Sequence, residues 1–233
     1  MRDVSALSVL LCATGAHGCS FLVTSLPPVK LAHGALDAAN AMQKRRGPDR
    51  TNIARVHGVT FVHNLLYMTG SPTTQPFVAP DKSVTAIFNG ELYNWRELDL
   101  PSSVQLASDG HALLPLYASD GPAFISRLRG EFAIVVVDHR RGIVLLATDT
   151  FGTKPLWVGQ SHAEGASRRS AFGLASYASA LRTLGLTRGL RQVDTNTVEV
   201  RRLRDFSRVV DTRVVHRFDL RQHIRVRVKV SLV

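Results

Sequence analysis

Residues 84–94, Val-Thr-Ala-Ile-Phe-Asn-Gly-Glu-Leu-Tyr-Asn, place hydrogen-bond donors beside an acid. Asn89-Gly90 follows an apolar, β-prone run, and both residue types tolerate positive φ, so the pair predicts a turn where a strand ends. Such a turn would bring together the amide of Asn89, the N–H of Gly90 and the carboxylate of Glu91. Two donors beside a carboxylate suit an oxyanion hole for acyl transfer. Taken alone, however, Asn-Gly is more typical of a surface hairpin.

Two cysteines compete for the role of nucleophile. Cys19 opens the β-prone run Cys-Ser-Phe-Leu-Val-Thr, whereas Cys12 is followed by Ala-Thr-Gly-Ala, which is a poor strand. We therefore favour Cys19, against the alternative of a buried structural cysteine at the start of a strand. Two cysteines do not make a disulfide framework, and no His/Cys pair stands at the spacing of a metal site.

Composition describes a globular chain with a basic end. A length of 233 residues allows one large domain or two small ones. The fractions of hydrophobic residues, 45%, and of charged residues, 20%, are typical of a globular protein. Of the net charge of +11, residues 182–233 supply the larger part, with 13 Lys or Arg against 5 Asp or Glu. Phe206 and Phe218 are the only aromatic residues there. A stacking platform for nucleic acid is therefore disfavoured, and a solvated or domain-docking basic face is preferred.

The first 18 residues predict a leader rather than part of the fold. Residues 4–13 are apolar and Ala16-His17-Gly18 follow, as in a short signal peptide with its cleavage site. A misassigned start codon and an unprocessed extension are equally open interpretations. No apolar run reaches about 18 residues, so we expect no transmembrane helix and no membrane partner. We assign the chain to the cytoplasm despite the signal-like leader before Cys19.

The pattern of apolar residues predicts strands and helices without a steady βαβα rhythm. The expected strands are 19–25, two within 56–69, 84–88, 132–137, 143–147 and 171–176, with β-alternating residues over 191–233. The expected helices are 29–45, 93–99, 110–118, 124–128 and 178–184. Such an order favours an α+β sandwich over a doubly wound parallel sheet.

Four motifs appear in order along residues 19–186. They are Arg46-Gly47-Pro48-Asp49; Phe-Asn-Gly-Glu-Leu-Tyr-Asn at 88–94; Ser108-Asp109-Gly110-His111; and Gly-Glu-Phe-Ala at 130–133 with Asp138 and Asp-Thr-Phe-Gly-Thr-Lys-Pro-Leu at 149–156. Together they resemble the class II glutamine amidotransferase domain of glutamine-hydrolysing asparagine synthetases. The resemblance implies an N-terminal-nucleophile hydrolase fold, a four-layer αββα sandwich. It also implies a glutaminase reaction, in which glutamine gives glutamate and ammonia.

The resemblance also assigns roles to individual residues. It implies that Cys19 becomes the first residue of the chain, so that its thiolate attacks the amide and its own α-amine acts as the base. A thiol with a pKa of ~8.5 and an α-amine of ~7.7–8.0 are well matched near neutral pH. Asn89 and Gly90 would form the oxyanion hole, Glu91 would shape the substrate pocket, and Asp109 would accept the α-ammonium group.

Other positions of the motifs carry no chemistry, or depart from the family pattern. Arg46 and Asp49 are interpreted as loop braces or a structural ion pair, and His111 as a helix-face residue. The family usually has an arginine for the glutamine α-carboxylate where this chain has Leu65. Either another cation or the N–H groups of residues 71–75 replace it, or glutamine binds weakly. Thr148 also stands where an arginine is common.

The expected domains are a leader at 1–18, an amidotransferase domain at 19–190, and a connector with a basic tail at 191–233. The synthetase domain of the family, with its Ser-Gly-Gly-x-Asp-Ser pyrophosphate loop, is missing from the sequence. The resemblance implies no cofactor or metal for the amidotransferase domain, because ATP and Mg²⁺ would belong to the synthetase domain. Implied partners are glutamine and a synthetase domain or subunit that uses the ammonia to make asparagine from aspartate. A homodimer stays open.

Two other functions compete with a glutaminase. The first is a catalytically inactive relative that keeps the fold as an interaction or regulatory module, which Leu65 and the residues before Cys19 favour. The second is amidotransfer to a sugar phosphate or phosphoribosyl acceptor. The amino-acid sequences of the motifs at 88–94 and 149–156 resemble the asparagine synthetase group more closely than they resemble enzymes with sugar phosphate or phosphoribosyl acceptors.

Overall fold

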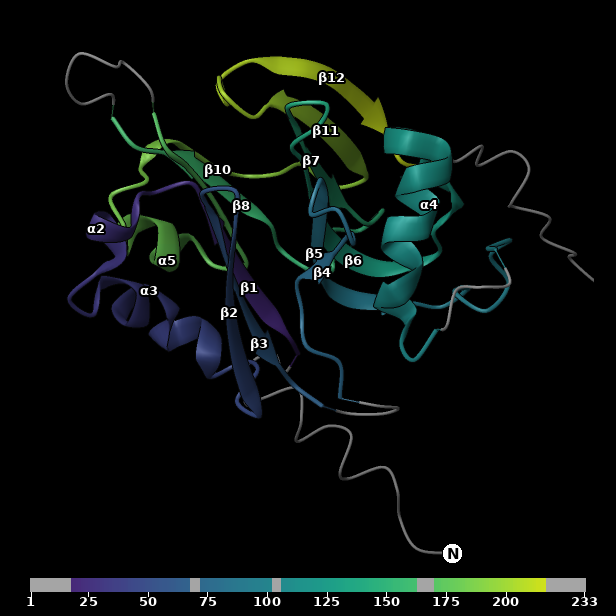
Figure 1. The fold of residues 1–233 in the computed structure, drawn as a ribbon, viewed down its shortest axis with the longest axis horizontal. Coiled ribbons are helices and arrows are strands. Elements are labelled where there is room, and N and C mark those ends of the chain that lie inside the picture. Colours follow the sequence, from purple (N-terminus) through teal and green to yellow (C-terminus); the bar gives the residue numbers. More distant parts are fainter. Residues whose placement is uncertain (1–17, 68–71, 102–105, 163–169, 217–233) are drawn as a thin grey trace, which may run out of the picture.

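The structure is a computed structural model that describes residues 18–67, 72–101, 106–162 and 170–216 (Figure 1). Residues 1–17 of the expected leader, which include Cys12, and the end of the basic tail lie outside the described residues. Two six-stranded antiparallel sheets form the centre of the fold. None of the helices in the described part of the chain is long and apolar enough to span a bilayer.

The first sheet contains the strand that follows Cys19. Its strands lie in the order β10-β8-β9-β1-β3-β2. Their bounds are β1 Ser20–Thr24, β2 Arg50–Val56, β3 Val59–Leu65, β8 Trp157–Gln160, β9 Phe172–Ala175 and β10 Arg188–Gln192. β1 is central and pairs with β3 on one side and β9 on the other, so its backbone is bonded along both edges. A central, fully paired strand gives Cys19 a rigid support.

The second sheet contains the Asn89-Gly90 pair. Its strands lie in the order β12-β11-β7-β6-β5-β4. Their bounds are β4 Phe77–Val78, β5 Val84–Leu92, β6 Gly130–Asp138, β7 Ile143–Thr148, β11 Thr197–Arg202 and β12 Val209–Val214. β11 pairs with β7 along five residues, from Val198 opposite Ala147 to Arg202 opposite Ile143. The boundary expected after residue 190 thus falls inside β10, and an amidotransferase unit ending there would leave β7 without its outer neighbour.

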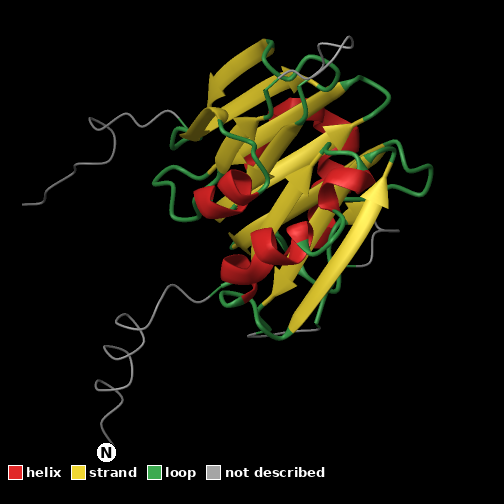
Figure 2. Cartoon of the chain, turned by 90° about the vertical axis from the view of Figure 1, so that its left-hand side faces the viewer, coloured by secondary structure: helices red, strands yellow, loops and turns green. Residues whose placement is uncertain are grey.

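Helices cover the outer face of each sheet. α2 Pro28–Leu31, α3 Ala35–Lys44 and α5 Ala178–Thr183 lie on the first sheet, and Figure 2 views the molecule from their side. η1 Asp109–Ala112, α4 Leu113–Asp120 and η2 Gly121–Arg127 lie on the second. Figure 1 shows the two sheets between these helical layers. The predicted four-layer αββα sandwich is confirmed.

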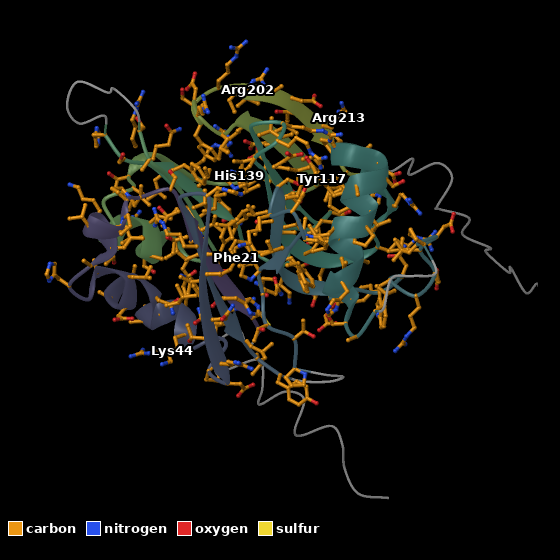
Figure 3. All side chains as sticks on the ribbon, viewed as in Figure 1. Phe21, Lys44, Tyr117, His139, Arg202 and Arg213 are labelled. Carbon is orange, nitrogen blue, oxygen red and sulfur yellow. The ribbon has the colours of Figure 1, made fainter. Side chains whose placement is uncertain are left out.

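Strand alternation divides the apolar residues among three cores. Phe21 and Val23 point into the layer between the two sheets, whereas Leu22 points toward α3 and α5. Figure 3 shows Phe21 near the middle of the molecule, between the sheets. In β5, Ile87 faces the layer between the sheets while Ala86 and Phe88 face α4. The same alternation fixes where the polar residues at the strand ends point.

Three sequence-based expectations about elements need correction. The helix expected at 29–45 is split into α2 and α3, because His33 and Gly34 have φ of 56° and 78°, which no helix accommodates. Residues 93–99 form successive turns instead of a helix. The Asn94 side chain ties them to the Arg127 carbonyl and the Arg129 N–H. Of the two strands expected within 56–69, the described residues 57–67 contain one, β3, and its hairpin partner β2 begins earlier, at Arg50, and ends at Val56.

The expectation of a turn at Asn89-Gly90 is also wrong. β5 continues through both residues to Leu92, and Asn89 pairs with Ala133 while Gly90 pairs with Phe132. β6 supplies a partner for the whole length of β5, and this tertiary pairing overrides the local turn propensity of Asn-Gly. The glycine is needed for another reason, given below.

His63 carries a pH dependence of stability. It lies in β3 with no exposed surface and no partner on either ring nitrogen among the described residues. Burial lowers its pKa from 6.5 to about 4. Between about pH 6.5 and pH 4, His63 is protonated in the unfolded chain but neutral in the native chain. The free energy of unfolding therefore falls by up to ~3 kcal/mol as the pH drops through this range. Chemical unfolding at pH 7 and pH 4.5 should show a smaller loss for His63→Leu than for the unmodified chain. An equal loss in both proteins would contradict this prediction.

Candidate active site

One pocket collects the predicted site residues, at the end of the sandwich where β1 begins and β3 and β5 end. It encloses about 540 Å³ of empty space, part of it open to solvent. Its lining residues are Cys19, Leu65, Leu66, Tyr67, Thr73, Gln75, Phe77, Phe88, Gly90, Glu91, Ser108 and Asp109. Four of the five predicted site residues therefore line a single cavity, although they come from three separate segments of the chain.

Cys19 lies at the edge of this pocket as a half-buried free thiol. Its Sγ atom accepts the Leu66 N–H at 3.4 Å. Burial raises the pKa of the Cys19 thiol, and the Leu66 hydrogen bond and the Arg46 guanidinium oppose that rise. A thiol with a raised pKa is mostly protonated at neutral pH, so it needs a base close by to become a nucleophile.

A buried polar network holds the segment that carries Cys19. The Ser20 hydroxyl donates to the Gln43 carbonyl at 2.7 Å and accepts from Asn64 at 3.1 Å. Asn64 also exchanges two hydrogen bonds with Asn40 of α3, at 2.8 and 3.0 Å. Because Ser20, Asn40 and Asn64 are bonded to one another and to the Gln43 backbone carbonyl, the network fixes β1 against β3 and α3. The position of Cys19 is thus set from the helical side of the sheet.

Asn89 points toward the same space from the opposite sheet. It pairs with Ala133, whose side chain lies in the core between the sheets, so its own side chain faces that layer. Cys19 has the same parity as Phe21 and Val23, which face that layer from β1. Asn89 is 1% exposed, and its Nδ2 has no hydrogen-bond partner among the described residues. Buried donors are rarely left unpaired, so this one is available for an acceptor that the described residues do not supply.

Gly90 has no room for a side chain. A Cβ at this position would lie 2.0 Å from the Glu131 carbonyl oxygen and 2.7 Å from the Phe132 Cα, both in the backbone of β6. The φ of 150° is also one that residues with a side chain rarely adopt. Glycine therefore lets β5 pair closely with β6 while its N–H stands at the pocket wall.

Replacing Gly90 tests this packing. Gly90→Ala should lower the free energy of unfolding by about 1–3 kcal/mol, because the new methyl group must push apart two paired strands. Urea unfolding measures the change. The matched control is Gly142→Ala, also at positive φ (64°), where a Cβ meets nothing within 4 Å. If the two variants lose the same stability, backbone strain alone explains the Gly90 effect and the close contact with β6 does not.

Glu91 and Asp109 bring two carboxylates to the pocket. Asp109 Oδ2 accepts the Leu92 N–H at 2.9 Å and Oδ1 accepts the Gly110 N–H at 2.8 Å. Burial raises the pKa of Asp109, against these two hydrogen bonds. Burial also raises the pKa of Glu91, and the nearby Asp109 and Glu131 raise it further. Like charges this close favour the binding of a cationic group between them.

The remaining motif residues have structural tasks. His111 Nδ1 accepts the Ser108 N–H at 3.1 Å and lies 2.9 Å from the Ser108 hydroxyl, which caps η1 and fixes Asp109 at its start. Asp49 accepts the Tyr67 N–H at 2.6 Å, so it braces the loop after β3. Arg46 is 6% exposed and packs against Gly18, and its Nε has no partner among the described residues.

Sequence reasoning missed two supports of the site. Gln75 Oε1 accepts the Phe88 N–H at 2.7 Å, which holds the loop before β4 against β5. Asp149 accepts four N–H groups and one hydroxyl from residues 132 and 151–154, and so folds the loop after β7 beside β6. The conspicuous motif at 149–156 was the available signal for Asp149. Nothing in the composition around Gln75 marks it out.

The arrangement suits nucleophilic attack on an amide carbonyl. Cys19, Gly90 and the carboxylates Glu91 and Asp109 line one cavity, and the amide of Asn89, which has no partner among the described residues, lies next to Gly90 in β5. Within the described residues no group of three or more His, Cys, Asp or Glu side chains could hold a metal ion. Cys19 directly precedes β1, Asn89 and Gly90 lie in β5, and these two strands pack against each other across the two sheets.

Comparison with known proteins identifies what this arrangement is similar to. The family model described as a glutamine amidotransferase domain matches residues 19–216. The glutamine-hydrolysing asparagine synthetase of Asparagus officinalis is 34% identical over 121 residues, which are 50% of this chain and 20% of that protein. Amidase chyE of Penicillium rubens is 42% identical over 88 residues, or 36% of this chain and 13% of that protein. The chain thus spans about a fifth or less of the length of these relatives.

A solved structure supports the fold. The allosteric regulatory enzyme of purine biosynthesis superposes with a TM-score of 0.58 at 14% identity, over 85% of this chain and 49% of that one. At such low identity the likeness concerns the fold alone. It agrees with the expected four-layer αββα sandwich.

Proposed function

Because this chain belongs to the glutamine amidotransferase domain family, we propose that it hydrolyses the side-chain amide of glutamine to glutamate and ammonia, with Cys19 as nucleophile. The observation that carries the proposal is the convergence of Cys19, Gly90, Glu91 and Asp109 on one pocket. Asn89 adds an unpaired donor behind that pocket.

The proposed reaction begins with a proton transfer. Once Cys19 is the first residue, its α-amine takes the thiol proton, and the thiolate attacks the amide carbon. The oxyanion receives hydrogen bonds from the Asn89 side chain and the Gly90 N–H, donors that gain strength as the charge develops. The protonated amine then gives its proton to the departing ammonia. Water, activated by the same amine, cleaves the thioester and releases the carboxylate product.

Substrate orientation is assigned to the two carboxylates. Asp109 has lone pairs left beyond its bonds to Leu92 and Gly110, so it can accept the α-ammonium group of the substrate. Glu91 lines the wall of the pocket beside Asp109. Burial and then repulsion by Asp109 raise the pKa of Glu91, and an ammonium between the two carboxylates would relieve that repulsion.

The use of the ammonia is also part of the proposal. Relatives named as asparagine synthetases are much longer than the region that matches this chain. We infer that a synthetase domain or subunit consumes the ammonia to convert aspartate to asparagine.

A direct assay tests the proposal. A chain that begins at Cys19 is incubated with glutamine, and glutamate is measured against a Cys19→Ala chain of the same length. Glutamate release only by the chain with Cys19 is the expected result. Equal release by both chains would end the hydrolase proposal for this protein.

A second candidate is an inactive relative that keeps the fold for interaction or regulation. Leu65 in the pocket wall and the 18 residues before Cys19 favour it. Mass spectrometry of the native N-terminus separates the two. A mature protein that begins at Cys19 supports catalysis, and one that keeps Met1 supports the inactive module.

A further inference from the structure

The charge of the pocket is one-sided. Among the described residues, the charged side chains that line it are the carboxylates Glu91 and Asp109, and none of the lining side chains is a Lys, Arg or His. Free glutamine, in contrast, carries both an ammonium and a carboxylate. The pocket therefore offers a partner for one of these charges and repels the other.

The wall that could have held a cation is apolar. Leu65 is the last residue of β3, and Leu66 follows it. The rings of Phe77 and Phe88 approach Gly110 of η1. Leu65 is only 8% exposed. A carboxylate placed against these side chains would lose its hydration without gaining an ion pair, which is strongly unfavourable.

Arg46 and Lys154, the described cations that act on Cys19 and Glu91, do not line the cavity. Arg46 stands behind Gly18 and Cys19, almost fully buried, and does not line the cavity. Lys154 is bound to Glu131 at 2.8 Å. Residues 68–71 and 102–105, which adjoin lining residues in the sequence, are Met-Thr-Gly-Ser and Ser-Ser-Val-Gln, so neither segment contains a cationic side chain.

We propose that the preferred substrate is a glutamine whose α-carboxyl group is already in an amide bond, that is, the N-terminal glutaminyl residue of a peptide. Such a substrate keeps the α-ammonium group for Asp109 and the side-chain amide for Cys19. Its neutral peptide carbonyl and an apolar second residue fit against Leu65, Leu66 and Phe77. The pocket is open to solvent, so the rest of the bound peptide can extend out of it. This inference rests on the proposed amidase function of the same site.

The reaction is the one proposed above with a longer substrate. The Cys19 thiolate forms a bond to the side-chain carbonyl carbon, the C–N bond breaks, and ammonia leaves with the proton held by the α-amine. Water then cleaves the thioester, which leaves a peptide with an N-terminal glutamate. No oxidant, reductant or further reactant is consumed.

A comparison of substrates tests the inference on a chain that begins at Cys19 and carries no substitution. Glutamine, glutamine α-amide and glutaminyl-leucine amide are compared, with N-acetyl-glutamine α-amide as the control that lacks the ammonium group. We expect kcat/KM to be about 10- to 1000-fold higher for glutaminyl-leucine amide than for glutamine, and to fall again for the acetylated compound. Because N-terminal glutamine also cyclises without an enzyme, the glutamate product is identified by mass and the Cys19→Ala rate is subtracted.

The outcomes separate the inference from the function on which it rests. A chain that prefers free glutamine over glutaminyl-leucine amide overturns the inference and leaves the amidase intact. A chain that hydrolyses neither overturns both. Leu65→Arg should raise kcat/KM for free glutamine by about 10- to 100-fold and lower kcat/KM for glutaminyl-leucine amide. If Leu65→Arg does not fold, the comparison of substrates on the unmodified chain still decides.

Discussion

A chain in which Gly18 precedes Cys19 should hydrolyse glutamine about 100- to 10,000-fold more slowly than a chain that begins at Cys19. The residue before Cys19 converts its α-amine into a peptide nitrogen, which cannot accept a proton. Burial already raises the pKa of the thiol, so without the amine little thiolate forms at neutral pH. Both chains can be released from a cleavable fusion that ends one residue earlier or later, and kcat/KM for glutamate release compares them.

The matched control for this experiment is structural. Gly18 donates its N–H to the Arg46 carbonyl at 3.3 Å and fits beside the Arg46 side chain, so the longer chain folds as it stands. Equal thermal unfolding of the two chains would show that the lost rate comes from the missing base. Equal activity of the two chains would mean that the α-amine of Cys19 is not the base and that another group takes the proton.

The motifs predicted the fold and the gathering of the site for a physical reason. Cys19 heads a strongly apolar run, and such a run in the middle of a sheet can only be buried, so its start is placed reliably. Asp109 follows Ser108 at the head of a helical segment, where a capping residue is expected. Local chemistry explains where both residues lie, whereas their roles were assigned from the resemblance of the motifs.

The features that could not be predicted depend on distant partners. Asn89-Gly90 lies in a strand because β6 pairs with it, and β6 lies about forty residues further along the chain. β8 was missed because Trp157–Gln160 is short and gains its order from β9 and β10. Gln75 supports the pocket through a single hydrogen bond to the Phe88 backbone. None of these contacts leaves a period or a motif in the sequence.

Asn89→Ala should lower kcat for glutamine about 100- to 1000-fold, because it removes one of the two donors for the oxyanion. The same change should cost little stability. Asn89 Nδ2 has no partner among the described residues, so truncation breaks no hydrogen bond and removes a buried polar group that is unpaired. Single-turnover rates and urea unfolding, measured on one preparation that begins at Cys19, give the two quantities.

Thr85 provides the matched control on the same strand. It faces the same layer between the sheets as Asn89, it has no exposed surface, and its hydroxyl also has no partner among the described residues. Thr85→Val should therefore leave the rate unchanged with an equally small effect on stability. The loss of rate should therefore distinguish Asn89, as a donor to the oxyanion, from Thr85, as a buried polar group that only lacks a partner among the described residues. If both variants slow the reaction alike, the buried polar groups of β5 act through packing, and Asn89 is not the oxyanion donor.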